Sequence, residues 1–536
     1  MTSLKSHTQI GYTDVTAKQS FFKNTELKAM TFFHIPHSDN YWRCLLNVAL
    51  TCKDFLDAAL NALWEELDSL VPLLKLLPAL QLEHNTYVCA YVHVFYMTLF
   101  CFKVLRVLSG NVSEADWDRL RYYSRKVKSF EFTCEDDPPI HSSTYFRIGQ
   151  LQSSALFPSL RCLYYHLDEI SISHIFLFLS PLLESLELYN IRGFEQTIVG
   201  PFLATLSSQM VHHIVLRNGE MSVDILKKLI VHFKQLRSLE LPDAVFLNDF
   251  GLWEVLGTLP FLEDLTLVVN DPESHPTHAP ENSHSQSGGT RYFEALESLH
   301  VTGSSFLIQH LLGFIDSPCL KLIEIIPVIN HQVDNELEVE EFFTPSMTIV
   351  SSKWSQSLKD FFICSSSFET KRCAISKLLI LLKDFQNMEN FRLDWRIKTQ
   401  DDLKSLVTLW PKLRTLDLNR TLVTLSSLWY IAENCPELHR LHIRLEGSTI
   451  EVPPFDNSRK SLRHNLEVLI VGRAPASSIS PQTMLQRQIK VTRHLGLMFP
   501  YLKFINVQSD DVFWSGIRDL FHFRQEAQDA CLSRVE

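Results

Sequence analysis

One short pattern recurs along most of this chain and constrains its fold more than any other feature of the sequence. The pattern is apolar-x-x-apolar-x-apolar, and thirteen copies follow one another at spacings of 23 to 38 residues. The copies begin at Leu160, Leu183, Val211, Leu236, Leu262, Leu296, Leu320, Leu358, Met388, Leu413, Leu438, Leu466 and Leu502. Internal repeats with a period of about 20 to 50 residues are typical of solenoids, in which each repeat stacks on its neighbours.

Proline occurs in phase with this pattern. It lies two residues before the first apolar position in seven copies, at Pro158, Pro181, Pro260, Pro318, Pro411, Pro436 and Pro500. Because proline cannot continue a helix, it ends one element just before the apolar triplet begins. Stretches between copies, such as "SVDILKKLIVHF" and "SSLWYIAENC", have helical apolar spacing. The repeating unit is therefore predicted to be strand, turn, helix, turn.

From about residue 157 to residue 507 the pattern resembles that of the leucine-rich-repeat family. The resemblance implies an α/β solenoid, with a parallel sheet on the concave face and helices on the convex face. The asparagine or cysteine that usually follows the third apolar position in this family is mostly absent, with Asn270 an exception. We therefore expect irregular repeats with variable turns.

Side chains between the apolar positions are predicted to face solvent on the concave side, because strand side chains alternate with a period of two. Ten of them are the candidate substrate-binding residues: Glu187, Glu240, Asp264, His300, Glu324, Asp360, Arg392, Asp417, Arg440 and His442. Their charge runs from acidic to basic along the chain, which would favour a bipolar partner. Polar residues on a solvent-facing strand are equally expected without any partner.

The bulk composition excludes several classes of protein. The chain has 536 residues, of which 46% are apolar and 21% charged, as in a folded protein of several domains or one repeat array. A net charge of −11 argues against a nucleic-acid binder that works through its overall charge. Eleven cysteines occur singly, without a C-x-x-C pair, and the N-terminus has no secretory signal. We expect reduced thiols in a cytoplasmic or nuclear protein.

Motifs for catalysis, metal binding and membrane insertion are missing from the sequence. No phosphate-binding glycine loop, H-E-x-x-H or G-x-S-x-G is present, so we expect neither an enzyme nor a cofactor. The histidines of the polar insertion 270–291 lack acidic or thiol partners at fixed spacing, so no metal site is expected. The apolar stretch 87–102 is shorter than the roughly 20 residues of a spanning helix, which favours a buried helix or strand pair.

The first 80 residues predict a small helical domain ahead of the repeats. Leucines at Leu56, Leu60, Leu63, Leu67 and Leu70 form a helical stripe, and Pro72 is expected to end or kink that helix. Before it, Ser38 is a plausible N-cap for another helix, in which apolar residues follow at steps of three to four: Trp42, Leu45, Leu46 and Ala49.

The stretch "LLNVALTCKDFLDAALNALWEEL", residues 45–67, resembles the second half of an F-box. Together with "LDSLVPLLKLLP" and "DWDRLRYYSRKVKSFEF", it resembles F-box and leucine-rich-repeat proteins that are expanded in mushroom-forming fungi. In that family the F-box docks the small adaptor subunit of a cullin-based (SCF-type) ubiquitin ligase, and the repeats hold a protein substrate. The resemblance implies that the adaptor surface is held or presented by Leu45, Leu46, Val48, Cys52, Phe55, Leu60, Leu63 and Trp64.

The front half of the F-box is degenerate. The family opens it with Leu-Pro and an acidic residue, whereas this chain has Ile35-Pro36 followed by His37. The leading hypothesis is a substrate-recognition subunit of the ligase. The alternative is a non-enzymatic binding scaffold whose F-box no longer binds the adaptor, and an enzyme with its site on the concave face is the third hypothesis.

The predicted domain organisation has five parts. They are a flexible N-terminus (1–30), an F-box-like helical domain (31–80), a helical linker and N-terminal cap (81–155), the solenoid (156–508) and a C-terminal capping helix (509–536). The acidic run 334–341 is expected to be a solvated surface loop.

Overall fold

The computed structural model describes most of the chain. The described residues are 24, 27, 31, 41–51, 53–85, 103–132, 138–151, 155–167, 172–191, 196–206, 210–217, 222–242, 250–268, 292–328, 336–364, 372–373, 376–397, 399–445, 462, 464–472, 481–507 and 511–532. They divide into two compact units, residues 1–236 and 237–536, each with its own run of strands and helices.

From Tyr41 onward, the first unit has two helices followed by a parallel sheet in the order β1-β4-β5-β6-β7. The strands β2 and β3 form a separate antiparallel pair. The elements are α3 (Tyr41–Thr51), α4 (Lys53–Trp64), β1 (Glu66–Leu67), α5 (Val71–Leu74), β2 (Leu80–Asn85), β3 (Lys103–Leu108), α6 (Glu114–Ser124), β4 (Ser129–Phe132), α7 (Ser142–Leu151), β5 (Cys162–His166), the 3-10 helix η1 (Ile172–Phe178), β6 (Ser185–Tyr189), α8 (Gln196–Leu206), β7 (His213–Arg217) and α9 (Val223–Ile230).

The second unit repeats the same alternation of strand and helix. Its sheet order is β8-β9-β10-β11-β12-β14-β16-β17-β18-β19, and β13 and β15 pair separately. The elements are β8 (Ser238–Pro242), α10 (Phe250–Gly257), β9 (Asp264–Val268), β10 (Ser298–Gly303), α11 (Ser305–Phe314), β11 (Leu322–Pro327), α12 (Glu336–Trp354), β12 (Asp360–Ile363), β13 (Arg372–Cys373), α13 (Ser376–Leu382), β14 (Asn390–Leu393), β15 (Arg396–Ile397), α14 (Gln400–Val407), β16 (Thr415–Val423), α15 (Leu425–Asn434), β17 (Arg440–Leu445), β18 (Val468–Gly472), α16 (Pro481–Met498), β19 (Phe504–Val507) and α17 (Val512–Leu532).

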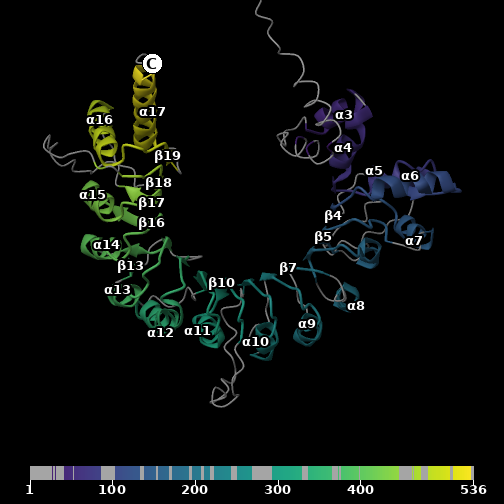
Figure 1. The fold of residues 1–536 in the computed structure, drawn as a ribbon, viewed down its shortest axis with the longest axis horizontal. Helices are drawn as coiled ribbons and strands as arrows, with labels where there is room; N and C mark the ends of the chain where they lie inside the picture. Colours follow the sequence, from purple (N-terminus) through teal and green to yellow (C-terminus); the bar gives the residue numbers. More distant parts are fainter. Residues whose placement is uncertain are drawn as a thin grey trace, which may run out of the picture. The chain divides into compact units, whose positions relative to one another are not determined.

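This architecture is the predicted α/β arrangement, a parallel sheet with helices along one side. Fifteen of the described strands belong to the parallel sheet, five in the first unit and ten in the second. In the second unit, α10 to α15 cover one side of the strands and leave the other side open (Figure 1). We call this uncovered side, in either unit, the open face of the sheet. A parallel sheet with a helix after most strands is the structure that the repeat pattern predicts.

The apolar anchors of the pattern form the core. In β5, Leu163 and Tyr165 are buried, whereas the alternate residues Cys162, Tyr164 and His166 are only partly buried. Neighbouring parallel strands repeat this alternation in register, so each anchor meets the equivalent anchor of the next repeat; Leu163, for example, pairs with Leu186 of β6. The prediction that anchors point inward is therefore confirmed.

The in-phase prolines lie in tight turns between a helix and the next strand. Ser180 and Ser317 each precede such a proline and are buried. The Ser317 hydroxyl donates to the Leu296 carbonyl at 2.6 Å, and the Ser180 hydroxyl donates to the Pro158 carbonyl at 3.3 Å. A buried polar side chain thus ties each of these turns to the preceding repeat.

The residue just before each strand also joins neighbouring repeats. The Arg161 carbonyl accepts the amides of both Glu184 and Ser185, each at 2.9 Å. Oppositely charged side chains in this row pair between neighbouring strands: Lys128–Glu65, Arg161–Glu184, Arg237–Glu263, Lys321–Glu297, Lys359–Glu389, Arg414–Glu389 and Lys503–Glu467, at 2.6 to 3.4 Å. Exposed pairs contribute about 0 to 1 kcal/mol each, so their main effect is to favour this register over a shifted one.

The last described element is the helix α17. The helix α17 packs against both α16 and β19, and Trp514 and Ile517 on it are buried. It covers the last strand of the sheet, which would otherwise expose an apolar surface. Among the described residues, no helix is both long and apolar enough to cross a membrane. The apolar stretch 87–102 and the insertion 270–291 lie outside the described residues.

Three local expectations differ from the structure. The helix that carries the leucine stripe ends at Trp64, and Glu66–Leu67 form β1, because the Glu65 carbonyl accepts the amides of Lys128 and Ser129 and draws the chain into the sheet. The acidic run expected as a loop forms the first turns of α12 from Glu336 onward. The parallel sheet starts at β1, ahead of residue 156, where the repeats are predicted to begin.

Substitution of two adjacent leucines in one turn, Leu182 and Leu183, tests whether the anchors are buried. Leu183 is fully buried whereas Leu182 is 50% exposed. We expect Leu183→Ala to lower the free energy of unfolding by about 2 to 5 kcal/mol, and Leu182→Ala by less than about 1 kcal/mol. Urea unfolding followed by circular dichroism measures the difference, and equal midpoints for the two variants would contradict the assignment of Leu183 to the core.

Candidate functional site

The helices α3 and α4 form a hairpin with its own small core. Tyr41, Leu45 and Ala49 of α3 are buried against Ala58 and Ala59 of α4. Small alanines on α4 let the two helices approach closely, so this core needs few large side chains. The hairpin contains all of the predicted adaptor-binding residues except Cys52, which lies outside the described residues.

Most of these predicted residues hold the hairpin together. Leu45 is fully buried, and Val48, Phe55 and Leu63 pack against the same core. Leu60 and Trp64 are half-buried. Leu46 differs from the rest, because it lies on the outer face of α3 and is 47% exposed.

The outer face of α3 carries a second apolar stripe. Trp42, Leu46 and Leu50 follow at steps of four residues and are 47%, 47% and 75% exposed. Steps of four place side chains on one face of a helix, one above the other. We call these three residues the outer stripe. Leu50 and Trp42 were not among the predicted contact residues, although this spacing is visible in the sequence.

Several contacts fix the hairpin to the helix α6 and the turn that follows it in the first unit. The Trp64 ring packs on Tyr123 of α6 with ring centroids 4.7 Å apart. The Tyr122 hydroxyl donates to the Asp57 carboxylate at 3.1 Å. Lys126 also donates to the side chain of Asn61 on α4. A partner bound to α3 would therefore be held in a fixed position relative to the open face of this unit.

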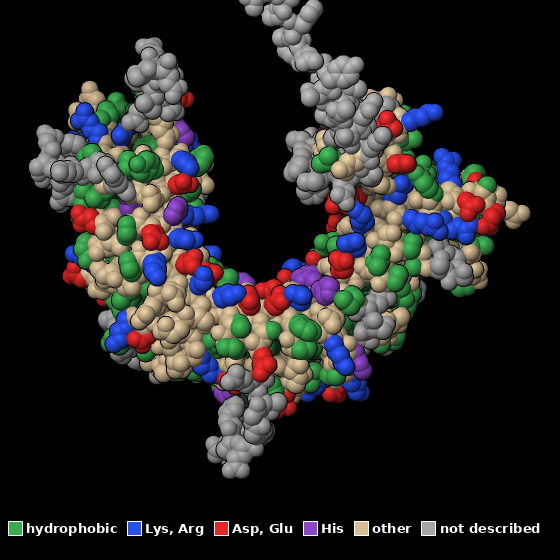
Figure 2. Space-filling view, in the orientation of Figure 1, with side chains coloured by type: hydrophobic (Ala, Val, Ile, Leu, Met, Phe, Trp, Pro, Cys, Tyr) green, Lys and Arg blue, Asp and Glu red, His purple; other side chains and the backbone are tan. Residues whose placement is uncertain are grey.

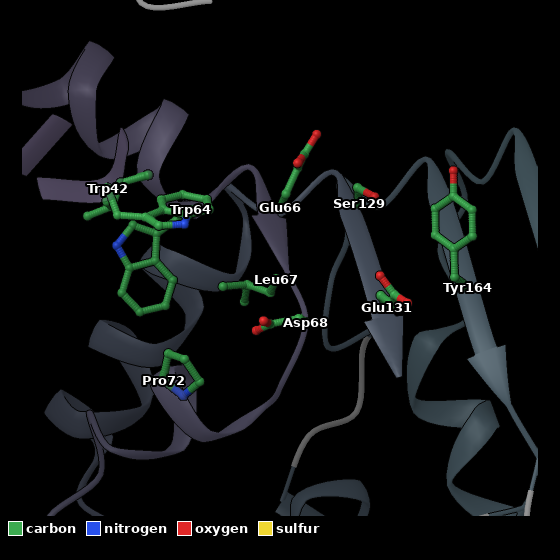
Figure 3. A pocket seen from close by; sticks show the side chains of 10 residues that line it. Trp42, Trp64, Glu66, Leu67, Asp68, Pro72, Ser129, Glu131 and Tyr164 are labelled. Carbon is green, nitrogen blue, oxygen red and sulfur yellow. The ribbon is translucent and has the colours of Figure 1, made fainter. Parts of the chain in front are cut away.

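A pocket of about 630 Å³ lies where the hairpin meets the sheet. The indoles of Trp42 and Trp64 lie at one end, and the carboxylates of Glu66, Asp68 and Glu131 follow along the strands β1 and β4 (Figure 3). Glu66, Asp68 and Glu131 lie ahead of the first predicted repeat, so the sequence analysis did not select them. Only Glu131 has a signal in the sequence, the triplet Val127-x-x-Phe130-x-Phe132, which follows the repeat pattern with phenylalanine in place of leucine.

Aromatic and acidic side chains continue along the open face of the first unit. Glu187, a predicted contact residue, accepts a hydrogen bond from the Tyr189 hydroxyl at 2.6 Å. Burial, followed by this hydrogen bond, raises the pKa of Tyr189 to about 12. The Tyr189 ring also stacks on His166 at 4.4 Å between centroids. The structure thus places Glu187 in an ordered group of side chains on this face.

In the second unit, His300 and Glu324 come together from neighbouring strands. They are in register on β10 and β11, and His300 Nδ1 lies 2.6 Å from Glu324 Oε2. The Cys364 thiol donates to the other carboxylate oxygen at 3.3 Å. The hydrogen bond from His300 lowers the pKa of Glu324.

A second group forms around Arg392. This residue, Asp417 and His442 are in register on β14, β16 and β17. The Arg392 guanidinium makes two hydrogen bonds of 3.0 and 3.1 Å to Asp394, which is 5% exposed, and lies 3.7 Å from Asp417. His442 Nδ1 lies 2.9 Å from Asp417. Three predicted contact residues therefore form one charged network on the open face.

The remaining predicted contact residues lie outside these groups of side chains. Asp360 accepts a hydrogen bond from Asn390 on the next strand. Burial, and then the neighbouring Glu263, raises the pKa of Asp264. Glu240 is half-buried, and Arg440 is exposed at the start of β17. Lys and Arg side chains lie beside Asp and Glu along the second unit in Figure 2, so this face is a mosaic of both signs.

The described part of the chain shows no group of three or more potential metal ligands. Cys364 is the thiol closest to a histidine–carboxylate pair, but burial and then the carboxylate of Asp394 raise its pKa far above the usual range. A thiol that stays protonated at neutral pH is a poor nucleophile.

No family model matches this chain, and no curated protein matches it. Solved structures resemble it at low identity. An internalin (inlF) from Listeria monocytogenes is 11% identical, with a TM-score of 0.27 over 68% of this chain and 79% of that chain. TLR13 in its complex with ssRNA13 is 13% identical, with a TM-score of 0.32 over 76% of this chain and 57% of that chain. A chain of the Rad7 and Elc1 complex in yeast is 14% identical, with a TM-score of 0.35 over 89% of this chain and 97% of that chain.

Removal of Arg392 tests the charged network. Arg392→Ala would leave Asp394 buried without its cation, and we expect the free energy of unfolding to fall by about 1 to 3 kcal/mol, since partial exposure of Arg392 moderates the loss. Arg237→Ala, which breaks an exposed pair with Glu263, is the matched control and should lower it by less than about 1 kcal/mol. Chemical denaturation of both variants measures the difference, and equal effects would show that the network adds no stability.

Acid titration tests the Glu324 pair. Because its pKa is lowered in the folded state, Glu324 contributes stability above the ordinary carboxyl pKa of 4.5 and loses it as the pH falls through the lowered value. The melting temperature of the wild type should therefore fall more steeply below pH 4.5 than that of Glu324→Gln. Glu254→Gln on α10 is the matched control and should follow the wild type. Parallel curves for wild type and Glu324→Gln would contradict the coupling.

Proposed function

We propose that this chain is a substrate-recognition subunit of a cullin-based (SCF-type) ubiquitin ligase. The α3–α4 hairpin docks the small adaptor subunit, and the open face of the sheet holds a protein target. The F-box-like sequence 45–67 forms this hairpin. The observation that carries the proposal is the outer stripe of α3, which presents apolar side chains to solvent while the opposite face of the same helix forms the hairpin core.

The outer stripe has the features of a helix that binds a partner. An amphipathic helix needs one apolar face to pack on its own domain, and α3 has a second one. Burial of each large apolar side chain stabilises a complex by up to about 1.5 to 3 kcal/mol. Three such side chains in one row can therefore supply the anchors of a helix-to-helix interface, in which residues at steps of three and four lie in a groove of the partner.

The chain itself performs no chemistry in this proposal. Its contribution is proximity, because a target bound on the sheet and an adaptor bound on α3 become parts of one assembly. Tethering of this kind raises the effective concentration of target lysines near a ubiquitin-loaded enzyme. For short connections this concentration is on the order of millimolar. The contacts of Trp64, Tyr122 and Lys126 matter here, because they keep the hairpin at a fixed position on the first unit.

The paired charges of the second unit favour a protein target. Arg392, Asp417 and His442 are already ordered by one another, so a partner does not have to immobilise them on binding. Charges held in a fixed mosaic select a partner by complementary charge and suppress others by like-charge contact. We infer a folded or extended protein segment as the ligand of this face.

Reduced thiols fit a cytoplasmic or nuclear location, which we propose for the chain. Five cysteines are free thiols in the structure: Cys44, Cys162, Cys319, Cys364 and Cys435. Disulfides persist mainly in oxidising compartments, and free buried cysteines are typical of reducing ones.

A binding scaffold without a ligase is the alternative function. The observation that favours it is the sequence Ile35-Pro36-His37, which departs from the Leu-Pro-acidic opening of an F-box. An adaptor interface that lacks part of its front half would bind more weakly, and each lost 1.4 kcal/mol corresponds to about tenfold in affinity.

Substitution of the outer stripe distinguishes the two functions. We expect wild type to co-purify with the adaptor, and Leu46→Asp with Leu50→Asp to abolish this, because two charges would be buried in the apolar interface. The control Leu151→Asp with Leu182→Asp changes two leucines of similar exposure, 48% and 50%, on the first unit. Circular dichroism confirms folding of both variants.

The outcome is read from three samples. Loss of the adaptor in the stripe variant alone supports the proposed function. Failure of folded wild type to recover any adaptor would exclude the ligase function and leave the scaffold. Equal loss in the control variant would show that the outer stripe is not the docking surface.

A further inference from the structure

The pocket between the hairpin and the sheet has a charge that nothing in the described part of the chain neutralises. Glu66, Asp68 and Glu131 are exposed carboxylates, and none of them pairs with a cation among the described residues. The nearby cations are engaged elsewhere, since Lys128 pairs with Glu65 at 2.8 Å and Arg161 with Glu184 at 3.4 Å. Three like charges on neighbouring positions raise the energy of the folded state unless a ligand offsets them.

The negative field reaches the far end of the pocket. Tyr164 lines that end, on β5 (Figure 3). Burial raises the pKa of Tyr164, and the carboxylates of Glu187, Glu131 and Glu66 raise it further. Burial is the largest cause, and Glu131 and Glu66 of the pocket add a smaller part of the rise in this pKa.

The aromatic end of the pocket is ordered before any ligand binds. Trp64 is held by its contact with Tyr123, at 4.7 Å between ring centroids. Trp42 lies edge-on to Tyr41 at 5.1 Å. Both indoles reach the pocket, as Figure 3 shows. A fixed indole face beside carboxylates attracts a planar cation, because the negative face of the ring and the carboxylates act in the same direction.

We propose that this pocket binds an arginine side chain from an exposed segment of the target protein. The guanidinium is planar, stacks on an indole and donates up to five hydrogen bonds in a fork that matches carboxylates. A lysine ammonium offers a point charge without the flat surface, so it uses the indoles less well. The inference rests on the proposed target binding by the sheet, and the pocket shares only Trp42 with the outer stripe, so the tests leave Trp42 unchanged.

The test uses the full chain and a defined probe. The probe is a fluorescein-labelled ten-residue peptide of glycine and serine with two arginines, and its partner carries citrulline at both positions. Citrulline keeps the shape of arginine and removes the charge. In fluorescence anisotropy titrations we expect the arginine peptide to bind at least about tenfold more tightly, because charge-assisted hydrogen bonds are lost with citrulline.

Matched variants locate the binding. Glu66→Gln with Glu131→Gln removes two pocket charges without changing side-chain size, and we expect about tenfold weaker binding of the arginine peptide. Asp224→Asn with Glu254→Gln removes two exposed charges from the helices α9 and α10, and it should bind as wild type does. The melting temperature of the pocket variant should equal or exceed that of wild type, since repulsion is relieved.

Three results would overturn the proposal: absence of arginine-peptide binding, equal affinity for the citrulline peptide, or equal weakening in both pairs of variants. The adaptor assay separates the two proposals. The pocket variant should still recover any adaptor that wild type recovers, and the variant with aspartates at Leu46 and Leu50 should still bind the arginine peptide. Loss of peptide binding in that second variant would show that the two surfaces are not independent and would also overturn the proposal.

Discussion

Stacking of parallel strands in register is the constraint on which the rest of this structure depends. A single repeat, such as β5 with its anchors Leu163 and Tyr165, has no apolar surface of its own to pack against. Burial comes only when the equivalent anchors of the next repeat lie beside it, as Leu186 and Leu188 do. The free energy of the fold is therefore mostly a sum of interfaces between neighbours, and a one-residue slip would turn every anchor toward solvent.

The same constraint determines where charge can lie. Because the anchors occupy one face of the sheet, the residues between them must lie on the open face. Side chains at the same position of successive repeats then lie next to each other on neighbouring strands. Arg392, Asp417 and His442 occupy equivalent positions in successive repeats, and the register brings them together. A charged network on this face is thus a consequence of the repeat, and opposite signs on neighbouring strands turn a potential repulsion into pairing.

Much of this could be read from the sequence, and the failures have physical causes. The anchors and prolines predicted the sheet because apolar spacing reports burial directly. The strand β1 was missed because its two residues carry no pattern, and it forms only through amides of Lys128 and Ser129. Leu45 faces the hairpin core and Leu46 faces solvent because of the angle between α3 and α4. The spacing of apolar residues in the sequence does not determine that angle. Asp394 was missed because it lies after the last anchor of its repeat.

The two units treat charge on the open face differently, and the contrast has a functional meaning. In the second unit, carboxylates such as Glu324 and Asp417 have histidine or arginine partners. In the described part of the first unit, Glu66 and Glu131 have none, although Lys128 and Glu65, just before the same two strands, pair with each other. Neighbouring strands can therefore hold ion pairs. The absence of ion pairs within the pocket lowers the stability of the folded chain, and a surface with only a structural role would not be expected to keep this cost. A cation supplied by a binding partner offsets that cost only in the complex, so the unpaired carboxylates favour binding over stability of the free chain.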